Sequence, residues 1–358
     1  MGKKGDSKRI VFLIGCMGRG GAERVISVLA NTYALQGWQV DILMLLEDRV
    51  EYELDENINT IFVGNKSVSR IRQIPIWINS IRRHIKENNP ERIVSFIARI
   101  NIITILSCLG LNKHIIISER NDPRADGRSI LTKISTYLLY PLAKNIVFQT
   151  KWAQDCFPKN IKKKSFIIPN PICVTTKIAE SKEKKIVAVG RLIEQKNHKM
   201  LIDAFKIISE KYSQYKLYIY GEGRLRKKLE TQIKDLNLSN NVFLPGNVTN
   251  VHEEISDAEI FVLSSNYEGL SNALLEAMMM GLPCITTNCS GVSEIIKNDY
   301  NGLLIPINNQ DKLVEALDKL IQDKAFANTI SKNSLISSNE YKAEKVFKCW
   351  ANIISEIN

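Results

Sequence analysis

Two successive series of buried strand patterns, each alternating with helical patterns, constrain the fold of this chain more than any other feature. The first series begins at residues 9–15 (RIVFLIG), and a helical pattern over 21–36 follows, with Val25, Leu29 and Leu35 on its apolar side. Such alternation is typical of a parallel sheet with helices on both faces. Further strands of this series are predicted at 39–46, 92–97, 113–118 and 145–149.

A polar segment with two prolines separates the two series. It reads IIPNPICVTTKIAESKEKK over residues 167–185 and predicts a domain boundary near 170–184. The second series has predicted strands at 185–190, 216–220, 242–246, 260–264 and 283–287. The length of 358 residues suits two or three domains. We therefore expect doubly wound α/β domains over 1–172 and 173–335, and a last helical segment over 336–358.

The positive charge of the chain lies in its first half. The formal net charge is +11, and residues 1–172 carry 26 Lys and Arg against 15 Asp and Glu, whereas residues 173–358 carry 23 of each. A basic half indicates an acidic partner, such as an anionic membrane surface, a diphosphate substrate or nucleic acid. A basic surface that serves only solubility is the alternative.

Several features favour a cytoplasmic protein. The seven cysteines are scattered without C-x-x-C spacing, which indicates thiols in a reducing compartment. The apolar run after the basic N-terminus has only the length of a strand, so we do not interpret it as a signal peptide. The most apolar stretch, residues 100–111 (INIITILSCLGL), is too short to span a bilayer and fits a core helix.

Two acids with seven residues between them mark the clearest candidate site. Glu268 follows the strand predicted at 260–264 and lies in a loop, whereas Glu276 lies in a short helix predicted over 272–280. Ser271 or Asn272 can cap this helix, whose N-terminus would then suit a phosphate. One carboxylate beside an anion site and a second one deeper can hold a sugar and a ribose by their hydroxyls. The alternative is a capped helix with two solvated acids.

The residues around these acids form a longer motif. The run EGLSNALLEAMMMGLP over 268–283, GVSE over 291–294 and NGLLIP over 301–306 resembles the retaining family-4 glycosyltransferases. The resemblance extends through nearly the whole chain. It implies the GT-B fold, in which two facing Rossmann-like doubly wound domains bind a nucleotide sugar, and it implies that the C-terminal helix, within 336–358, returns to the first domain. It also implies that Glu268 orients the transferred sugar and that Glu276 binds the ribose.

The resemblance assigns further donor contacts. Arg191 and Lys196, in VGRLIEQKN (189–197), match the cations that bind the diphosphate and stabilise it as it leaves. Two exposed bases without such a role are the alternative. The remaining candidates for the donor site are Gly20 and Gly21 in GGAER, Asn247 and Val248 in LPGNV, and Gly269, Leu270, Ser271 and Asn272 beside Glu268.

The sequence favours catalysis without a metal or another cofactor. It contains no D-x-D motif, with which the GT-A class typically holds a divalent ion, and its four histidines (84, 114, 198 and 252) are dispersed. Arg191, Lys196 and a helix N-terminus would instead stabilise the leaving diphosphate.

One position departs from the pattern of related enzymes. They often carry a histidine just after S-E near the transferred sugar, but IIISERNDP (115–123) places Arg120 there. Arg120 is therefore a candidate contact to the sugar or to an acceptor phosphate, and the role of the histidine does not transfer. An arginine paired with Glu119 or Asp122 is the alternative.

Two basic segments are candidates for membrane contact. Residues 70–86 (RIRQIPIWINSIRRHIK) place isoleucines on one stripe beside Trp77 and several arginines, and Lys162–Lys164 form a second cluster. A basic amphipathic segment with Trp can lie in a membrane interface. Packing of the stripe on the sheet of its own domain, and a solvated turn at 162–164, are the alternatives.

Together these features predict a glycosyltransferase at the cytoplasmic face of the plasma membrane. It would transfer a hexose or N-acetylhexosamine, with retention, from a UDP-sugar to a saccharide on polyprenyl diphosphate, as bacterial enzymes of capsule, O-antigen or glycoprotein assembly do. The proposed partners are thus the donor, the lipid-linked acceptor and an anionic membrane, with no nucleic acid. A UDP-sugar 2-epimerase of the same fold and a basic nucleic-acid-binding protein are the alternatives.

Overall fold

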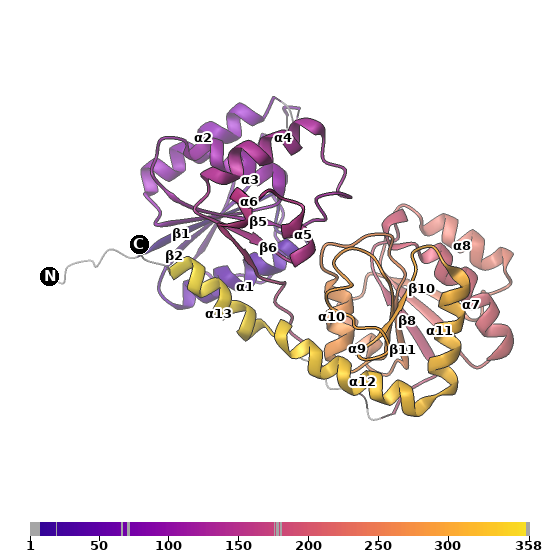
Figure 1. The fold of residues 1–358 in the computed structure, drawn as a ribbon. Coiled ribbons are helices and arrows are strands. Elements are labelled where there is room, and N and C mark those ends of the chain that lie inside the picture. The colour runs from indigo at the N-terminus through magenta and orange to yellow at the C-terminus, as the bar shows by residue number, and fades with distance from the viewer. Residues whose placement is uncertain are drawn as a thin grey trace. The chain divides into compact units, whose positions relative to one another are not determined.

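The computed structural model describes residues 8–355 except 19, 66, 70, 71, 175, 177, 178 and 180. The chain divides into two compact units, in each of which helices cover both faces of a sheet (Figure 1). Unit 1 comprises Met1–Pro171 and Val346–Asn358, and unit 2 comprises Ile172–Lys345. The expected boundary after residue 172 falls beside this division, but unit 2 extends past the expected end at residue 335 to Lys345.

Unit 1 contains, within the described residues, a seven-stranded parallel sheet in the order β3-β2-β1-β4-β5-β6-β7. Its strands are β1 (Arg9–Ile14), β2 (Gln39–Met44), β3 (Ile58–Phe62), β4 (Arg92–Phe96), β5 (His114–Glu119), β6 (Asn145–Phe148) and β7 (Ser165–Ile167). Its helices are α1 (Gly21–Leu35), α2 (Ile74–Asn88), α3 (Ala98–Cys108), α4 (Ile130–Leu139), η1 (Tyr140–Leu142), α5 (Lys151–Asp155) and α6 (Lys159–Lys162).

The period of two along the strands of unit 1 separates two buried cores. Ile10, Phe12 and Ile14 of β1 belong to the core with α1, whereas Val11 and Leu13 belong to the core with α2 and α3. Helix α13 (Ala343–Ser355) begins in unit 2, and its later part completes the first of these cores. The side chain of Trp350 is fully buried there, with its ring centroid 5.7 Å from that of Phe96.

Unit 2 contains, among the residues described, a six-stranded parallel sheet in the order β10-β9-β8-β11-β12-β13. Its strands are β8 (Lys185–Val189), β9 (Lys216–Tyr220), β10 (Val242–Gly246), β11 (Ile260–Leu263), β12 (Cys284–Thr287) and β13 (Leu303–Ile305). Its helices are η2 (Glu194–Lys196), α7 (His198–Lys211), α8 (Arg226–Asp235), α9 (Val251–Ile255), α10 (Asn272–Met279), α11 (Gln310–Gln322), α12 (Lys324–Ser338) and η3 (Asn339–Tyr341).

The strand order of unit 2 reverses between β8 and β11. The chain runs outward from β8 through β9 to β10, and then returns to place β11 on the other side of β8. In open parallel sheets, ligands bind outside the carboxyl ends of the strands at such a switch point. A ligand site is therefore expected at the loops after β8 and β11.

Helix α2 packs on its own sheet, as one of the two interpretations of residues 70–86 expected. Trp77, Ile81 and Ile85 are at most 4% exposed and belong to a core of unit 1. The interpretation of Trp77 as a membrane contact is therefore wrong, because the ring is covered by protein. Residues 70 and 71 of this segment lie outside the described residues. None of the described helices is both long and apolar enough to cross a membrane.

A buried carboxylate ties β2 to α2 in unit 1. Asp41 is 1% exposed, and its oxygens accept hydrogen bonds from His84 Nε2 at 3.0 Å and Asn59 Nδ2 at 2.9 Å, while Arg9 Nη1 lies at 3.2 Å. Burial alone would raise the pKa of Asp41, but the bonds from His84 and Asn59 and the nearby positive charge outweigh it, so that its pKa lies below the ordinary value. Its carboxylate is thus more favourable in the folded than in the unfolded chain.

Replacing Asp41 with Asn is expected to lower the free energy of unfolding by about 2 kcal/mol at pH 7, because buried donors lose a charged acceptor. A carboxyl group with a depressed folded pKa stabilises the fold above its unfolded pKa of about 3.9 and loses that contribution as the pH falls through the folded value. The difference between variant and wild type should therefore shrink in acid. Urea unfolding at several pH values checks this, with Asp48→Asn at an exposed position as the control. Equal stability of Asp41→Asn and wild type at pH 7 would contradict it.

Candidate active site

A buried ion pair lies at the switch point of the unit 2 sheet. Lys196, in the loop after β8, places Nζ 2.6 Å from Oε1 of Glu268, in the loop after β11. The two side chains are 13% and 7% exposed. Residues 72 positions apart in sequence meet here because β8 and β11 are neighbours in the sheet.

Several further contacts hold the Glu268 loop in place. Ser265 Oγ donates a second hydrogen bond to Glu268 Oε1, at 2.6 Å, and Ser264 Oγ donates to the Lys196 carbonyl at 2.9 Å. The loop therefore fixes the position of the carboxylate through Oε1.

Gly291 supports the same loop from the segment after β12. Its φ of +78° favours glycine, and a Cβ there would lie 1.8 Å from the Gly269 carbonyl oxygen. Ser290 Oγ donates to the Glu268 carbonyl at 3.2 Å. The GVSE motif, which carried the resemblance without an assigned role, thus packs under the loop that carries Glu268.

The second acid of the motif has a different partner. Glu276 lies on α10, is 6% exposed and has Oε2 3.5 Å from His252 Nε2 of α9. Ser271 caps α10, accepting a hydrogen bond from the Leu274 backbone N–H at 3.4 Å, as one of the two predicted caps. The interpretation of both acids as solvated is wrong, because each is buried and paired.

The other candidates in unit 2 lie along the same carboxyl edge of the sheet. Arg191 follows β8 directly and is exposed, in contrast to the half-buried Lys196. Asn247 and Val248 follow β10, Asn247 exposed and Val248 packed against the core beside α10. Leu270 is buried, while Gly269 and Asn272 are half-buried at the start of α10.

Sequence reasoning did not assign His198 to this region. Burial, and after it the charge of Lys196, lowers the pKa of His198 to about 4, so its ring is neutral at physiological pH. It begins α7 two residues after Lys196. The neutral ring therefore adds no second positive charge beside Lys196. The only sequence signal was its position next to KN.

The glycines of unit 1 follow β1, at the point where the strand order of that sheet reverses. Gly20 precedes the first residue of α1, Gly21, and its carbonyl accepts a hydrogen bond from Tyr52 Oη at 3.0 Å. A Cβ at Gly20 would lie 2.2 Å from Glu23 Oε2. A side chain at position 20 would therefore displace the flexible carboxylate of Glu23.

Arg120 is buried within unit 1 and has neither of the acidic partners proposed for it. It is 6% exposed, donates from Nη1 to Asn170 Oδ1 at 2.9 Å, and lies over the rings of Phe96 and Trp350 at 5.1 and 5.4 Å. Burial lowers the pKa of its guanidinium, which still leaves it charged at neutral pH. The predicted pairing with Glu119 is wrong, because Glu119 pairs with Arg128 at 3.1 Å.

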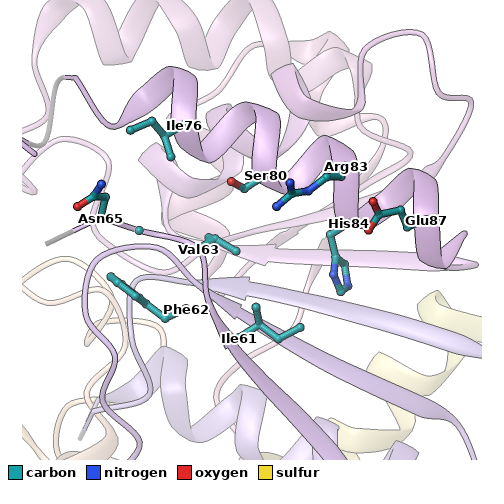
Figure 2. A pocket seen from close by; sticks show the side chains of 10 residues that line it. Ile61, Phe62, Val63, Asn65, Ile76, Ser80, Arg83, His84 and Glu87 are labelled. Carbon is teal, nitrogen blue, oxygen red and sulfur yellow. The ribbon is translucent and has the colours of Figure 1, made fainter.

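Unit 1 also contains a cavity of about 520 Å³ between the end of β3 and α2 (Figure 2). Ile61 and Val63 line one side, and Ser80, Arg83 and His84 come from the helix. His84 is one of the residues that line this cavity, and its hydrogen bond to Asp41 holds its ring in place. Across the described part of the chain, no three His, Cys, Asp or Glu residues are grouped to hold a metal ion.

Comparison with known proteins shows which class of protein this chain resembles. Residues 176–335 match the family model "Glycosyl transferases group 1". The structure of HepE from Anabaena with UDP and glucose superposes with a TM-score of 0.84 at 17% identity, over 97% of this chain and 99% of that one. The chain thus has the GT-B fold.

Relatives in sequence cover nearly the whole chain, and two of them are as follows. An uncharacterized glycosyltransferase of Haemophilus influenzae is 28% identical over 97% of this chain and 100% of its own length. The N-acetylgalactosamine-N,N'-diacetylbacillosaminyl-diphospho-undecaprenol 4-alpha-N-acetylgalactosaminyltransferase of Campylobacter jejuni is 29% identical over 90% of this chain and 93% of its own length. The protein is accordingly an enzyme, a glycosyltransferase whose unit 2 carries the group 1 motifs.

Proposed function

We propose that this glycosyltransferase moves a hexose or N-acetylhexosamine from a UDP-sugar to a lipid-linked saccharide, with retention of configuration and without a metal ion. The observation that carries the proposal is the buried Lys196–Glu268 pair at the switch point of unit 2. The Campylobacter relative, whose name specifies a diphospho-undecaprenol acceptor, supports the class of acceptor. The basic charge of residues 1–172 suits an anionic acceptor at the cytoplasmic face of the membrane.

In this proposal, different residues of unit 2 bind the sugar and the diphosphate. Glu268 Oε2 accepts a hydrogen bond from a sugar hydroxyl, while Oε1 stays on Lys196 and Ser265. Lys196 and the exposed Arg191 face the diphosphate with the N-terminus of α10. Glu276 binds the ribose, and Asn247 and Val248 contact the base. In unit 1, Gly20 and Gly21 lie in the loop that contacts the donor. Arg120 contacts the sugar or the acceptor phosphate.

In this proposal the reaction is a front-face displacement, as the resemblance to the retaining family-4 glycosyltransferases implies. The bond between the anomeric carbon and the diphosphate oxygen breaks, and the acceptor oxygen forms a bond to that carbon on the same face. The acceptor proton passes to the departing phosphate oxygen, so no protein nucleophile is required. Lys196 and Arg191 stabilise the negative charge that develops on the leaving group.

A panel of nucleotide sugars against polyprenyl-diphosphate saccharides tests the proposal, with the acceptor read by mass spectrometry. We expect a UDP-sugar to add one hexose or one N-acetylhexosamine to a lipid-linked acceptor. Selective use of another nucleotide, or transfer only to acceptors without a lipid, would contradict it.

Transfer is expected to continue at an unchanged rate in excess EDTA. In this proposal Lys196, Arg191 and the N-terminus of α10 stabilise the leaving diphosphate, so that no divalent ion is needed. The rate measured with EDTA, with added Mg²⁺ and with added Mn²⁺ checks it. Loss of transfer in EDTA with recovery on addition of Mn²⁺ would refute the assignment of Lys196 and Arg191.

A further inference from the structure

Helix α4 of unit 1 exposes most of its apolar side chains, although Leu139 packs against the core. Of its ten residues only Thr136 is buried, while Ile130, Leu131 and Leu138 are 77%, 74% and 69% exposed. The outward apolar surface, which we name the α4 face, consists of Ile130, Leu131, Ile134, Tyr137 and Leu138 of the helix and Leu142 of the following turn.

Local hydrogen bonds satisfy polar groups of this helix. Thr136 Oγ1 donates to the Lys133 carbonyl at 2.7 Å, so the inward hydroxyl is satisfied within the helix. Ser129 caps the helix, and its Oγ accepts from the Thr132 backbone N–H at 3.2 Å. A helix that only covered its own core would direct its isoleucines and leucines toward the sheet. Monomeric proteins rarely expose a contiguous apolar surface of this kind unless it meets a partner.

Basic residues border the α4 face. Lys133 and Lys144 are exposed, and Lys164 Nζ donates to the Pro141 carbonyl at 2.7 Å, next to Leu142. The sequence from 127 to 154 contains no Asp or Glu. Just beyond it, Asp126 pairs with Arg128, and Asp155 pairs with Lys151 and Lys162. The surface therefore combines an apolar centre with a rim rich in lysine.

We infer that the α4 face binds an anionic phospholipid bilayer, with the apolar side chains in the interface and the lysines against the headgroups. A helix with this pattern lies in the membrane plane, and anionic lipids attract each nearby lysine. Two copies of this chain joined through the same face would instead bring their lysines together. The charge of the rim thus favours lipid over self-association.

This surface replaces the one expected from residues 70–86. The buried stripe of α2 cannot enter a membrane, and Arg82 of that helix donates to the carbonyls of Ser107 and Leu109 at 3.0 and 2.7 Å. The inference does not depend on the identity of the acceptor. It places unit 1 of a glycosyltransferase on the membrane through α4 whichever sugar is transferred.

Co-sedimentation of the full chain with phosphatidylcholine–phosphatidylglycerol vesicles tests the inference. Replacing Leu131 and Leu138 together with Gln is expected to lower the partition coefficient at least about tenfold, because two inserted side chains are lost. A matched control replaces Leu35 and Ile336, which are 79% and 62% exposed elsewhere, with Gln and should leave binding unchanged. Thermal unfolding of both variants confirms that they are folded.

A second pair of variants separates charge from insertion. Lys133→Gln with Lys144→Gln should weaken binding to anionic vesicles and reduce its dependence on salt. Equal binding of wild type and the Leu131→Gln, Leu138→Gln variant would overturn the inference. So would a dimer, seen by sedimentation velocity without vesicles, that this variant converts to a monomer. The vesicles contain no polyprenyl lipid, so either outcome leaves the proposed reaction to its own test.

Discussion

Replacing Glu268 with Gln is expected to lower the rate of sugar transfer about a hundredfold or more. The carboxylate lies at the switch point of unit 2, held by Lys196 and Ser265 through Oε1. The amide keeps the shape of the side chain but removes the charge that holds Lys196 and accepts from the sugar. Positioning of the donor and stabilisation of the transition state are then lost together. Steady-state kinetics with the donor varied measures the effect.

The control for this variant is Glu315→Gln. Glu315 is exposed on α11, where it pairs with Lys312 at the surface. This control should keep the wild-type rate and unfolding temperature, whereas Glu268→Gln, which leaves Lys196 beside a neutral amide, should fold but unfold at a lower temperature. A folded Glu268→Gln enzyme with near-wild-type kinetics would remove Glu268 from the site.

Replacing Lys196 with Ala is expected to have a comparable effect on turnover. The variant loses a cation at the leaving diphosphate and leaves the buried Glu268 carboxylate without its partner. Breaking a buried ion pair from one side also destabilises a protein, by about 3–5 kcal/mol. Turnover and the free energy of unfolding should therefore both fall. Lys199→Ala, three residues later with a side chain that is 73% exposed, is the control and should change neither.

A double variant separates these two effects. Combining Lys196→Met with Glu268→Gln removes both charges, so most of the stability should return while transfer stays low. Recovery of transfer with stability would mean that the pair acts only in folding. The diphosphate role of Lys196 would then be wrong.

The strands that sequence patterns missed are edge strands. β3 and β7 border the unit 1 sheet, and β13 borders the unit 2 sheet. β3 (INTIF) carries exposed Asn59 and Thr60, while β7 and β13 have three residues each. Central strands of a parallel sheet are covered on both faces and appear as apolar runs, whereas short or half-exposed edges do not. The central strands were therefore predictable, and these edges were not.

The site was predictable as a set of residues but not as a geometry. The motif around Glu268 and Glu276 assigned both acids to one region, but their partners depend on contacts distant in sequence. Lys196 reaches Glu268 because two strands are adjacent, and His252 reaches Glu276 from another helix. The burial of Arg120 depends on Trp350, which lies in the last helix. Such contacts follow from topology and packing, which no local pattern contains.

The stoichiometry and stereochemistry of one reaction test the central claim most directly. The nucleotide sugar that the enzyme uses as donor is incubated with enzyme and lipid-linked acceptor. The products are followed by nuclear magnetic resonance. The account predicts one UDP released for each sugar added, with the anomeric configuration of the donor kept in the new linkage. Return of the donor as its C2 epimer without change in the acceptor, or an inverted linkage, would contradict it.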